Sequence, residues 1–146
     1  MAVLVRDANV NDYKALNSLN LNGLGYDYPI ELTKQRLNLV LDNQKARIYV
    51  AEFDGAVAGY IHAVDYDCIY FDSLKNILAI VVDESYRGNG VGKSLLSAVE
   101  KWAKEDGASG VRLVSGENRK NAHKFYKACG YKDRKVQKNL IKLFNE

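Results

Sequence analysis

The segment "VVDESYRGNGVGKSLL" (residues 81–96) places an arginine and three glycines directly before a stretch with helical spacing. Glycine lets a backbone curl and approach a ligand without Cβ clashes, so that several N–H groups can point toward one anion. The helix that follows adds its unpaired N–H groups and the positive end of its dipole, while Arg87 and Lys93 add formal charge. These features predict a phosphate-binding loop at 87–93. A tight turn without a ligand is the alternative that the glycines alone leave open.

Two common phosphate-binding motifs do not fit this segment. "GKS" at 92–94 imitates the end of a nucleotide-triphosphatase P-loop, but the glycine that the motif requires five positions earlier is Arg87. The dinucleotide motif G-x-G-x-x-G also fails, because either frame places Lys93 or Leu95 where the third glycine should be. The sequence therefore argues against both nucleotide-binding classes.

Strands and helices on both sides must position this loop. Asp54-Gly55 between two β-rich runs is a strong hairpin signal, and the apolar run 76–82 is typical of a strand buried on both faces, central in its sheet. Glycines at 107 and 130 are natural helix stops. Strands are expected at 3–6, 47–53, 57–64, 76–82, 111–115, 131–136 and 139–144, and helices over 13–19, over 30–41, from Val91 to the stop at Gly107, and over 119–130.

Length and composition predict one ordinary globular domain over residues 1–146. The chain is 47% hydrophobic and 27% charged, and its longest apolar run, 77–82, is too short to cross a bilayer. The N-terminus lacks the basic start and apolar stretch of a signal peptide, so we expect a cytoplasmic protein. Cys68 and Cys129 form no C-x-x-C pair and have no nearby His/Cys cluster, which suggests neither a disulfide framework nor a metal site.

Charge is divided unevenly along the chain. Residues 1–75 contain 7 Lys/Arg and 10 Asp/Glu, a net −3, whereas residues 76–146 contain 14 and 8, a net +6. A basic half suits an anionic ligand and an acidic half suits a cationic one, although many such charges merely solvate a surface. By itself, the division favours a solvated surface over a binding site.

The segment 87–92 matches R/Q-x-x-G-x-G/A, the acyl-CoA pyrophosphate loop of the GCN5-related N-acetyltransferase (GNAT) family, which this chain resembles. "LAIVVDESYRG" is similar to the family's fourth strand, and "SGENRKNAHKFYKACGY" (115–131) is similar to its later motif ending in F-Y-x-x-x-G-Y/F. The expected element order agrees as well. The resemblance implies an α/β fold of the α+β type, with a mixed, mostly antiparallel sheet of about seven strands flanked by about four helices.

The resemblance implies a site for acetyl-CoA, the co-substrate, where the strand 76–82 splays from the strand 111–115. Backbone groups of the splayed strand would bind the pantetheine arm, and loop amides would bind the pyrophosphate. Asn118 is the alternative to Asn121 as a pantetheine contact. The cofactor-binding residues expected from the resemblance are Ile80, Val82, Arg87, Gly88, Asn89, Gly90, Val91, Gly92, Lys93 and Asn121.

The resemblance further implies direct attack of a neutral amine on the thioester. Tyr126 occupies the position of the family's tyrosine acid, which protonates the departing thiolate; a residue that only orients the sulfur, or only packs, is the alternative. The general base is not assigned. His62 and His123 are each better interpreted as structural, and Asn76 stands near where some family members carry an acidic base.

The sequence thus predicts an acetyl-CoA-dependent N-acetyltransferase acting on a primary amine of a small molecule, peptide or protein. A catalytically silent acyl-CoA-binding sensor on the same fold is the alternative. The acidic half of the chain predicts a cationic or amine-bearing acceptor, whose identity the expected acceptor segments 19–30 and 65–75 do not reveal. Nucleic acid is not expected as a partner, because no aromatic-and-basic recognition motif accompanies the Lys/Arg residues. A membrane is not expected either, because the longest apolar run is too short to cross it. The oligomeric state stays open, with a homodimer as one alternative.

Overall fold

The computed structural model describes residues 2–145. It divides into two compact units, Met1–Val114 and Ser115–Glu146, each described by itself. The described residues contain no helix long and apolar enough to cross a membrane. The first unit contains β1 (Val3–Asp7), α1 (Tyr13–Leu19), α2 (Ile30–Leu41), β2 (Ala46–Phe53), β3 (Ala56–Tyr66), β4 (Leu74–Val82), α3 (Val91–Glu105) and β5 (Gly110–Leu113), with 3-10 turns at Val10–Asp12 and Glu84–Tyr86 and a π-helical turn at Asn20–Leu24.

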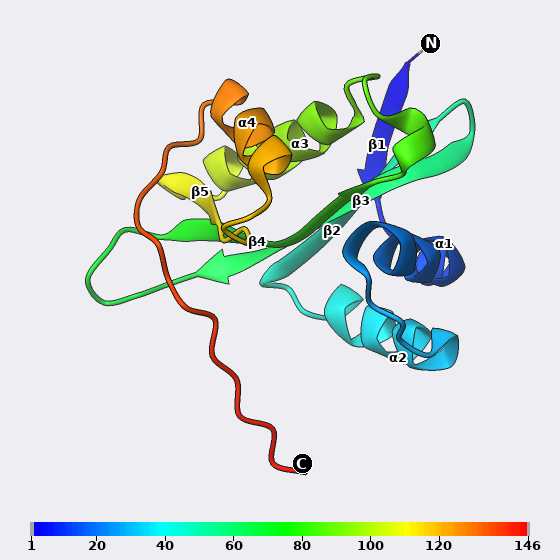
Figure 1. Cartoon of the computed structure of the whole chain (residues 1–146), viewed down its shortest axis with the longest axis horizontal. Coiled ribbons are helices and arrows are strands. Elements are labelled where there is room, and N and C mark those ends of the chain that lie inside the picture. The colour runs from blue at the N-terminus through cyan, green and yellow to red at the C-terminus, as the bar shows by residue number, and fades with distance from the viewer. Residues whose placement is uncertain (1, 146) are drawn as a thin grey trace. The chain divides into compact units, whose positions relative to one another are not determined.

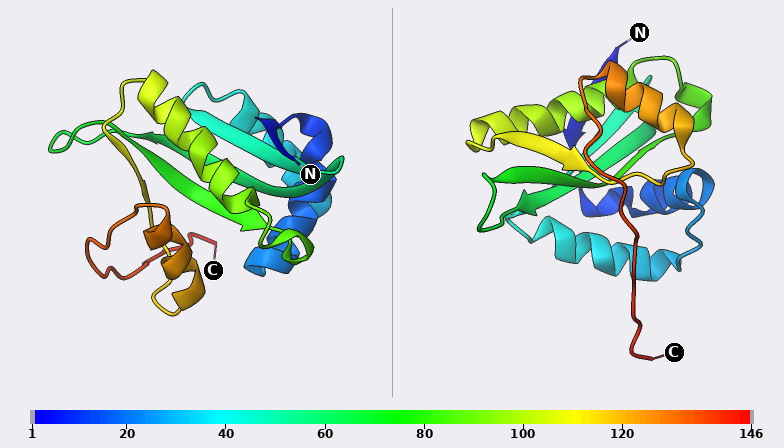
Figure 2. Two further views of the ribbon diagram at one scale, coloured as in Figure 1. Left: turned by 90° about the horizontal axis from the view of Figure 1, so that it is seen from above. Right: turned by 60° about the vertical axis from the view of Figure 1, so that its left-hand side comes forward.

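The strands form one mixed sheet in the order β1-β2-β3-β4-β5. The first three pairings are antiparallel, and only β4 and β5 run parallel. Helix α3 covers one face of the sheet, and α1 and α2 cover the other (Figures 1 and 2). The predicted mixed, mostly antiparallel sheet between helices is confirmed, and β4 is an interior strand, as its apolar sequence indicated.

Local sequence explains the elements that frame the loop. Asp54 and Gly55 both have positive φ, 53° and 80°, which is the backbone of the tight hairpin turn predicted between β2 and β3. The buried side chains of α3 recur at helical spacing on the side that packs against the sheet. Gly107, with φ of +76°, follows the end of α3 in the left-handed conformation expected of a helix stop.

A buried lysine fixes the lower half of β4, residues 74–77. Lys75 is 3% exposed, and its ammonium group pairs with the carboxylates of Asp65 on β3 and Asp106 at the end of α3. The same ammonium lies 3.9 Å from the ring centre of Trp102 on α3. Because a buried charge is tolerated only when it is paired, these contacts hold β3, β4 and the carboxyl end of α3 together.

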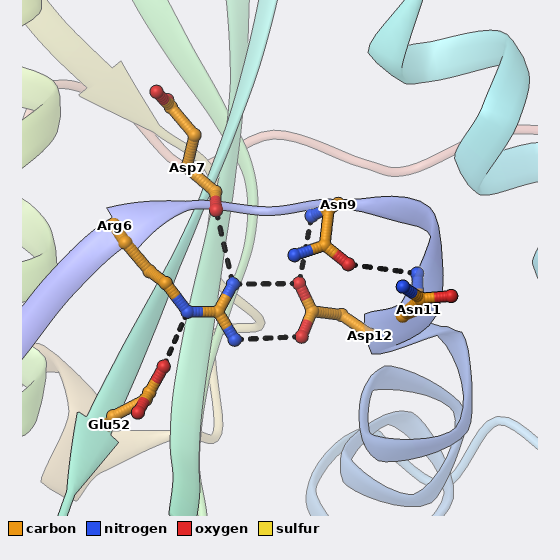
Figure 3. A network of polar contacts seen from close by, with 6 residues as sticks. All are labelled: Arg6, Asp7, Asn9, Asn11, Asp12 and Glu52. Carbon is orange, nitrogen blue, oxygen red and sulfur yellow. Dashed lines mark hydrogen bonds and ion pairs between the residues drawn. The ribbon is translucent and has the colours of Figure 1, made fainter. Parts of the chain in front are cut away.

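An arginine joins the first strand to the first helix. Figure 3 shows the Arg6 guanidinium donating to both carboxylate oxygens of Asp12, at 2.9 Å each, and to Glu52 on β2. Asp12 also accepts from the Asn9 backbone N–H, and the Asn9 side chain accepts from the N–H of Asn11. This reciprocal capping arrangement fixes where the chain turns from β1 into α1.

The second unit contains α4 (Lys120–Ala128), which ends where Gly130 has φ of +95°. This helix and its glycine stop were predicted. The two strands predicted at 131–136 and 139–144 are wrong, because the described residues after 130 form no strand. The sheet therefore has five strands rather than the expected seven or so. The misprediction has a physical reason: a run of β-formers becomes a strand only when a neighbouring strand supplies its hydrogen bonds.

Candidate functional site

The glycine-rich loop has the backbone that the sequence suggested. Gly88 and Gly90 have φ of +84° and +81°, a region that side-chain-bearing residues rarely adopt, and nothing lies within 4 Å of a Cβ built on either. The Asn89 side-chain amide donates to the Tyr86 carbonyl at 3.0 Å, which braces the loop from within. A contribution of Asn89 to anion binding would therefore come from its backbone N–H.

Helix α3 begins at the loop without a side-chain cap. Gly90 occupies the capping position, and no side chain of the described residues caps this end. The Ser94 N–H makes the first helical bond, to the Gly90 carbonyl at 3.0 Å, so the N–H groups of Val91, Gly92 and Lys93 have no partner within the helix. Together with the helix dipole, these donors give the exposed loop the chemical features that favour an anion.

A bulge in β4 lies where the pairing of β4 with β5 ends. The register pairs Ile77 with Ala63 and Ala79 with His62, so Leu78 is an extra residue without a partner in β3. The pairing of β4 with β5 ends at the same point, since Ile77 and Leu113 are its last partners. A bulge bends its strand and increases the local twist. Beyond Leu78, β4 has no partner on the side of β5, because β5 ends at Leu113.

The upper half of β4, residues 79–82, directs the backbone groups of every second residue away from β3. The Asp83 N–H donates to the Ala58 carbonyl at 2.7 Å, and antiparallel pairing alternates, so Val81 also bonds toward β3. Ile80 and Val82 therefore direct their N–H and C=O groups to the opposite side, where β5 no longer pairs with the strand. These are the two β4 residues predicted from the sequence to bind the cofactor.

Gly59 permits the close approach of three elements beside this site. A Cβ on Gly59 would lie 2.5 Å from the carbonyl oxygen of Val81, 3.2 Å from the Cα of Val82 and 3.3 Å from a methyl of Val91. The missing side chain thus allows β3, the upper half of β4 and the first residue of α3 to meet. A glycine inside a strand pattern, as at position 59, is the sequence signal that predicts such an approach.

β4 has no Asp or Glu near the point where its pairing with β5 ends. Asn76 accepts a hydrogen bond from Arg112 on β5 at 2.7 Å, which ties the two strands just before they part. His62 is half-buried, and its Nε2 atom is buried without a hydrogen-bond partner among the described residues. Burial lowers the pKa of the His62 imidazole, so the ring is neutral at pH 7 and resists taking up a proton.

The π-helical turn at Asn20–Leu24 packs against the other face of the sheet. The Tyr60 hydroxyl on β3 donates to the Asn20 side chain, and burial raises the pKa of Tyr60 to about 12. A Cβ on Gly23 would lie 2.5 Å from a methyl of Val81. These contacts place the segment expected to contact the acceptor against the upper half of β4. The sequence carried no signal for the widened turn.

The remaining predicted residues lie in the second unit. Tyr126 is buried on α4, with its ring centre 5.5 Å from Phe125 and 6.3 Å from Tyr131. Burial raises the pKa of the Tyr126 phenol, although the charge of Arg119 partly opposes the change. Asn118 precedes α4 and Asn121 lies in its first turn, and both are exposed.

Comparison with known protein sequences finds acetyltransferases of one family. The model of the acetyltransferase (GNAT) family matches residues 13–131. An N-alpha-acetyltransferase of Sulfurisphaera tokodaii is 31% identical over 143 residues, covering 90% of this chain and 81% of the relative. An uncharacterized N-acetyltransferase of Methanocaldococcus jannaschii is 29% identical over 100 residues, covering 65% of this chain; the match spans only 43% of that longer protein.

Solved structures agree at the level of the fold. The aminoglycoside acetyltransferase AAC(6')-Iy, in complex with a bisubstrate analogue, superposes with a TM-score of 0.86 at 19% identity, covering 98% of this chain and 99% of that one. At this identity the likeness shows a shared fold and no more.

The approach at Gly59 generates a prediction. Gly59→Ala places a methyl group against a backbone oxygen that cannot move aside as a side chain can, so we expect a loss of about 1–3 kcal/mol in the free energy of unfolding. Gly110→Ala is the matched control, because its Cβ would meet only the Leu74 side chain at 3.4 Å. Urea unfolding measures both, and equal stabilities of the two variants would contradict the account.

Proposed function

Because the chain belongs to the GNAT family of acetyltransferases, we propose that it is an acetyl-CoA-dependent enzyme that acetylates a primary amine by direct attack. Family membership makes the protein an acyltransferase acting on amines. The observation that carries the finer proposal is that the pairing of β4 with β5 ends at Ile77, so that the rest of β4 has one unpaired side, and the chain then continues through residues 83–90 to the uncapped start of α3. The cytoplasm is the compartment proposed for the reaction.

We propose the loop and β4 as the two binding elements for the co-substrate. In this proposal the N–H groups of residues 88–93 bind the pyrophosphate, and the side chains of Arg87 and Lys93 add positive charge. Ile80 and Val82 offer backbone donors and acceptors to the amide-containing pantetheine arm. Anchoring a long, flexible molecule at both places holds its thioester at the opened part of the strand. Asn121 remains the proposed contact from α4.

The chemistry requires little from the protein beyond position and proton transfer. The nitrogen of a neutral amine bonds to the thioester carbonyl carbon, and an N–H group of the splayed strand stabilises the charge that develops on the oxygen. The C–S bond then breaks, the nitrogen loses a proton to water, and the thiolate takes a proton from Tyr126. Because burial raises the pKa of Tyr126 above its ordinary value, the phenol stays protonated at neutral pH and is available as the acid.

We further propose an acceptor whose amine has a low pKa. A peptide α-amine, with a pKa near 7.8, is roughly a quarter neutral at pH 7.4, whereas a lysine side chain is only about one part in a thousand neutral. The site suits the former, because β4 carries no carboxylate base and the half-buried His62 resists protonation. The archaeal relative that is named an N-alpha-acetyltransferase supports this choice.

Release of free CoA with a panel of amines tests the proposal. Peptides with a free N-terminus and no lysine should be acetylated at pH 7.4, and N-terminally blocked peptides that contain lysine should react at least about tenfold more slowly. The advantage should shrink as the pH rises toward 10, because the lysine amine then becomes neutral. A preference for lysine at neutral pH would refute the acceptor assignment, and no CoA release with any amine would favour a silent acyl-CoA sensor.

The pyrophosphate position is tested by a pair of glycine variants. Gly90→Val forces a β-branched residue into the left-handed region and displaces the loop donors, so CoA affinity should fall at least about tenfold. Gly107→Val imposes the same backbone strain at the other end of α3, about 22 Å away, and should leave affinity within about twofold. Calorimetry measures both. Equal effects on affinity would place the pyrophosphate elsewhere.

The role of Tyr126 is tested by removing one oxygen. Tyr126→Phe keeps the ring packing, so stability and CoA affinity should change little, while kcat should fall about 100-fold, with the largest defect below the thiol pKa of about 8.5. Loss of an orienting contact alone would slow turnover about tenfold or less. Tyr131→Phe, on the neighbouring ring, should keep a near-parental kcat. A near-parental kcat for Tyr126→Phe across this pH range, with chemistry rate-limiting, would move the acid role to water or His123.

A further inference from the structure

A buried tyrosine on β3 attaches the π-helical turn, Asn20–Leu24, to the sheet. Tyr60 is 7% exposed and belongs to the apolar cluster formed by α1, α2 and the sheet. Its hydroxyl donates to the Asn20 side chain at the start of the turn. A buried tyrosine hydroxyl usually has such a partner, because an unpaired polar group is costly in apolar surroundings. The bond therefore fixes the start of the turn relative to β3.

The same turn contacts the upper half of β4. A Cβ on Gly23 would lie 2.5 Å from a methyl of Val81, so the turn approaches the strand closely at this residue. Tyr60 is the β3 partner of Val81, and both of these contacts therefore meet β4 at one position. Ile80 and Val82, on either side of it, have the backbone groups proposed to bind the co-substrate. The turn thus lies against the part of β4 proposed to hold the thioester.

Hydrogen bonds connect the turn to the exposed segment that follows it. The Tyr26 N–H donates to the Asn20 carbonyl at 3.1 Å. The Asn17 side-chain amide donates to the Tyr28 carbonyl at 2.7 Å. Residues 25–28 are all exposed, so these bonds rather than burial set the path of the segment. A displacement of Asn20 is therefore expected to displace the segment as well.

Helix α3 covers one face of the sheet, and α1, which continues into the turn, lies on the other (Figures 1 and 2). An acceptor that reaches β4 from the face opposite α3 must pass the turn. We propose that Tyr60 is a positioning residue for the amine acceptor, which through Asn20 holds the turn where the turn and the upper half of β4 bind the acceptor together. This inference rests on the proposed acetyl transfer. The role is one of position alone, since burial raises the pKa of Tyr60 to about 12 and keeps its hydroxyl a protonated donor at neutral pH.

Steady-state kinetics of Tyr60→Phe, with the two substrates varied separately, tests the inference. The variant keeps the buried ring but releases Asn20, so the KM for a lysine-free peptide with a free N-terminus should rise about three- to tenfold. The KM for acetyl-CoA and the kcat should stay within about twofold, whereas a general loss of structure would change all three. The ratio of parent to variant kcat/KM should be equal at pH 7 and pH 9, because Tyr60 transfers no proton.

Tyr49→Phe is the matched control. Tyr49 pairs with Ile61, the residue after Tyr60, so its side chain lies on the opposite face of the sheet. Removing its oxygen should leave both KM values near those of the parent. A peptide KM of Tyr60→Phe within about twofold of the parent, or an equal rise for both substrates, overturns the inference.

A double-mutant cycle tests whether Tyr60 acts through Asn20. Asn20→Ala removes the same bond from the helix side and should raise the peptide KM to a similar extent, and this variant decides the question if Tyr60→Phe does not fold. Tyr60→Phe/Asn20→Ala should raise the peptide KM no further than the larger single effect, because both changes remove one contact. Single effects that multiply in the double variant overturn the inference. If the parent releases CoA with no amine, the proposed acetyl transfer and this inference both fail, whereas peptide turnover that the Tyr60 and Asn20 variants leave unchanged refutes the inference alone.

Discussion

The site depends on one extra residue in β4. Leu78 has no partner in β3, and at the same position β5 stops pairing with β4. A bulge bends its strand, and beyond it Ile80 and Val82 direct backbone groups to the side on which the pairing with β5 has ended. Residues 74–77 of β4 thus pair with strands on both sides, whereas residues 79–82 pair only with β3 and form the proposed binding edge.

The two ends of helix α3 contact the two halves of β4 in different ways. At its carboxyl end, Asp106 and Trp102 contact the buried ammonium of Lys75 on the lower half of β4. At its amino end, Gly59 allows Val91 to approach β3 and the upper half of β4, and the helix donors stay without a cap. The paired charge of Lys75 thus fixes the carboxyl end of α3. At the amino end, the lack of a side-chain cap leaves the helix N–H groups available for the proposed anion.

The turns and helix ends of this arrangement could be predicted from short stretches of sequence, because they depend on the backbone preferences of a few neighbouring residues. Asp54-Gly55 predicted the hairpin, Gly107 the end of α3, and the glycines at 88 and 90 the curled backbone of the loop before α3. The bulge at Leu78 left no local signal, since it depends on the register between strands. The final strands were mispredicted for the same reason: residues 131–144 have strand-like composition, but a strand also needs a neighbour.

Amide hydrogen exchange with and without acetyl-CoA tests the central claim most directly. If the split strand and the loop bind the co-substrate, residues 80–82 and 88–93 should gain protection together, because both sets of N–H groups would acquire acceptors. The amides of β1 and of residues around Gly107 should be unchanged. Protection confined to other parts of the chain, or none at acetyl-CoA concentrations that support turnover, would contradict the account.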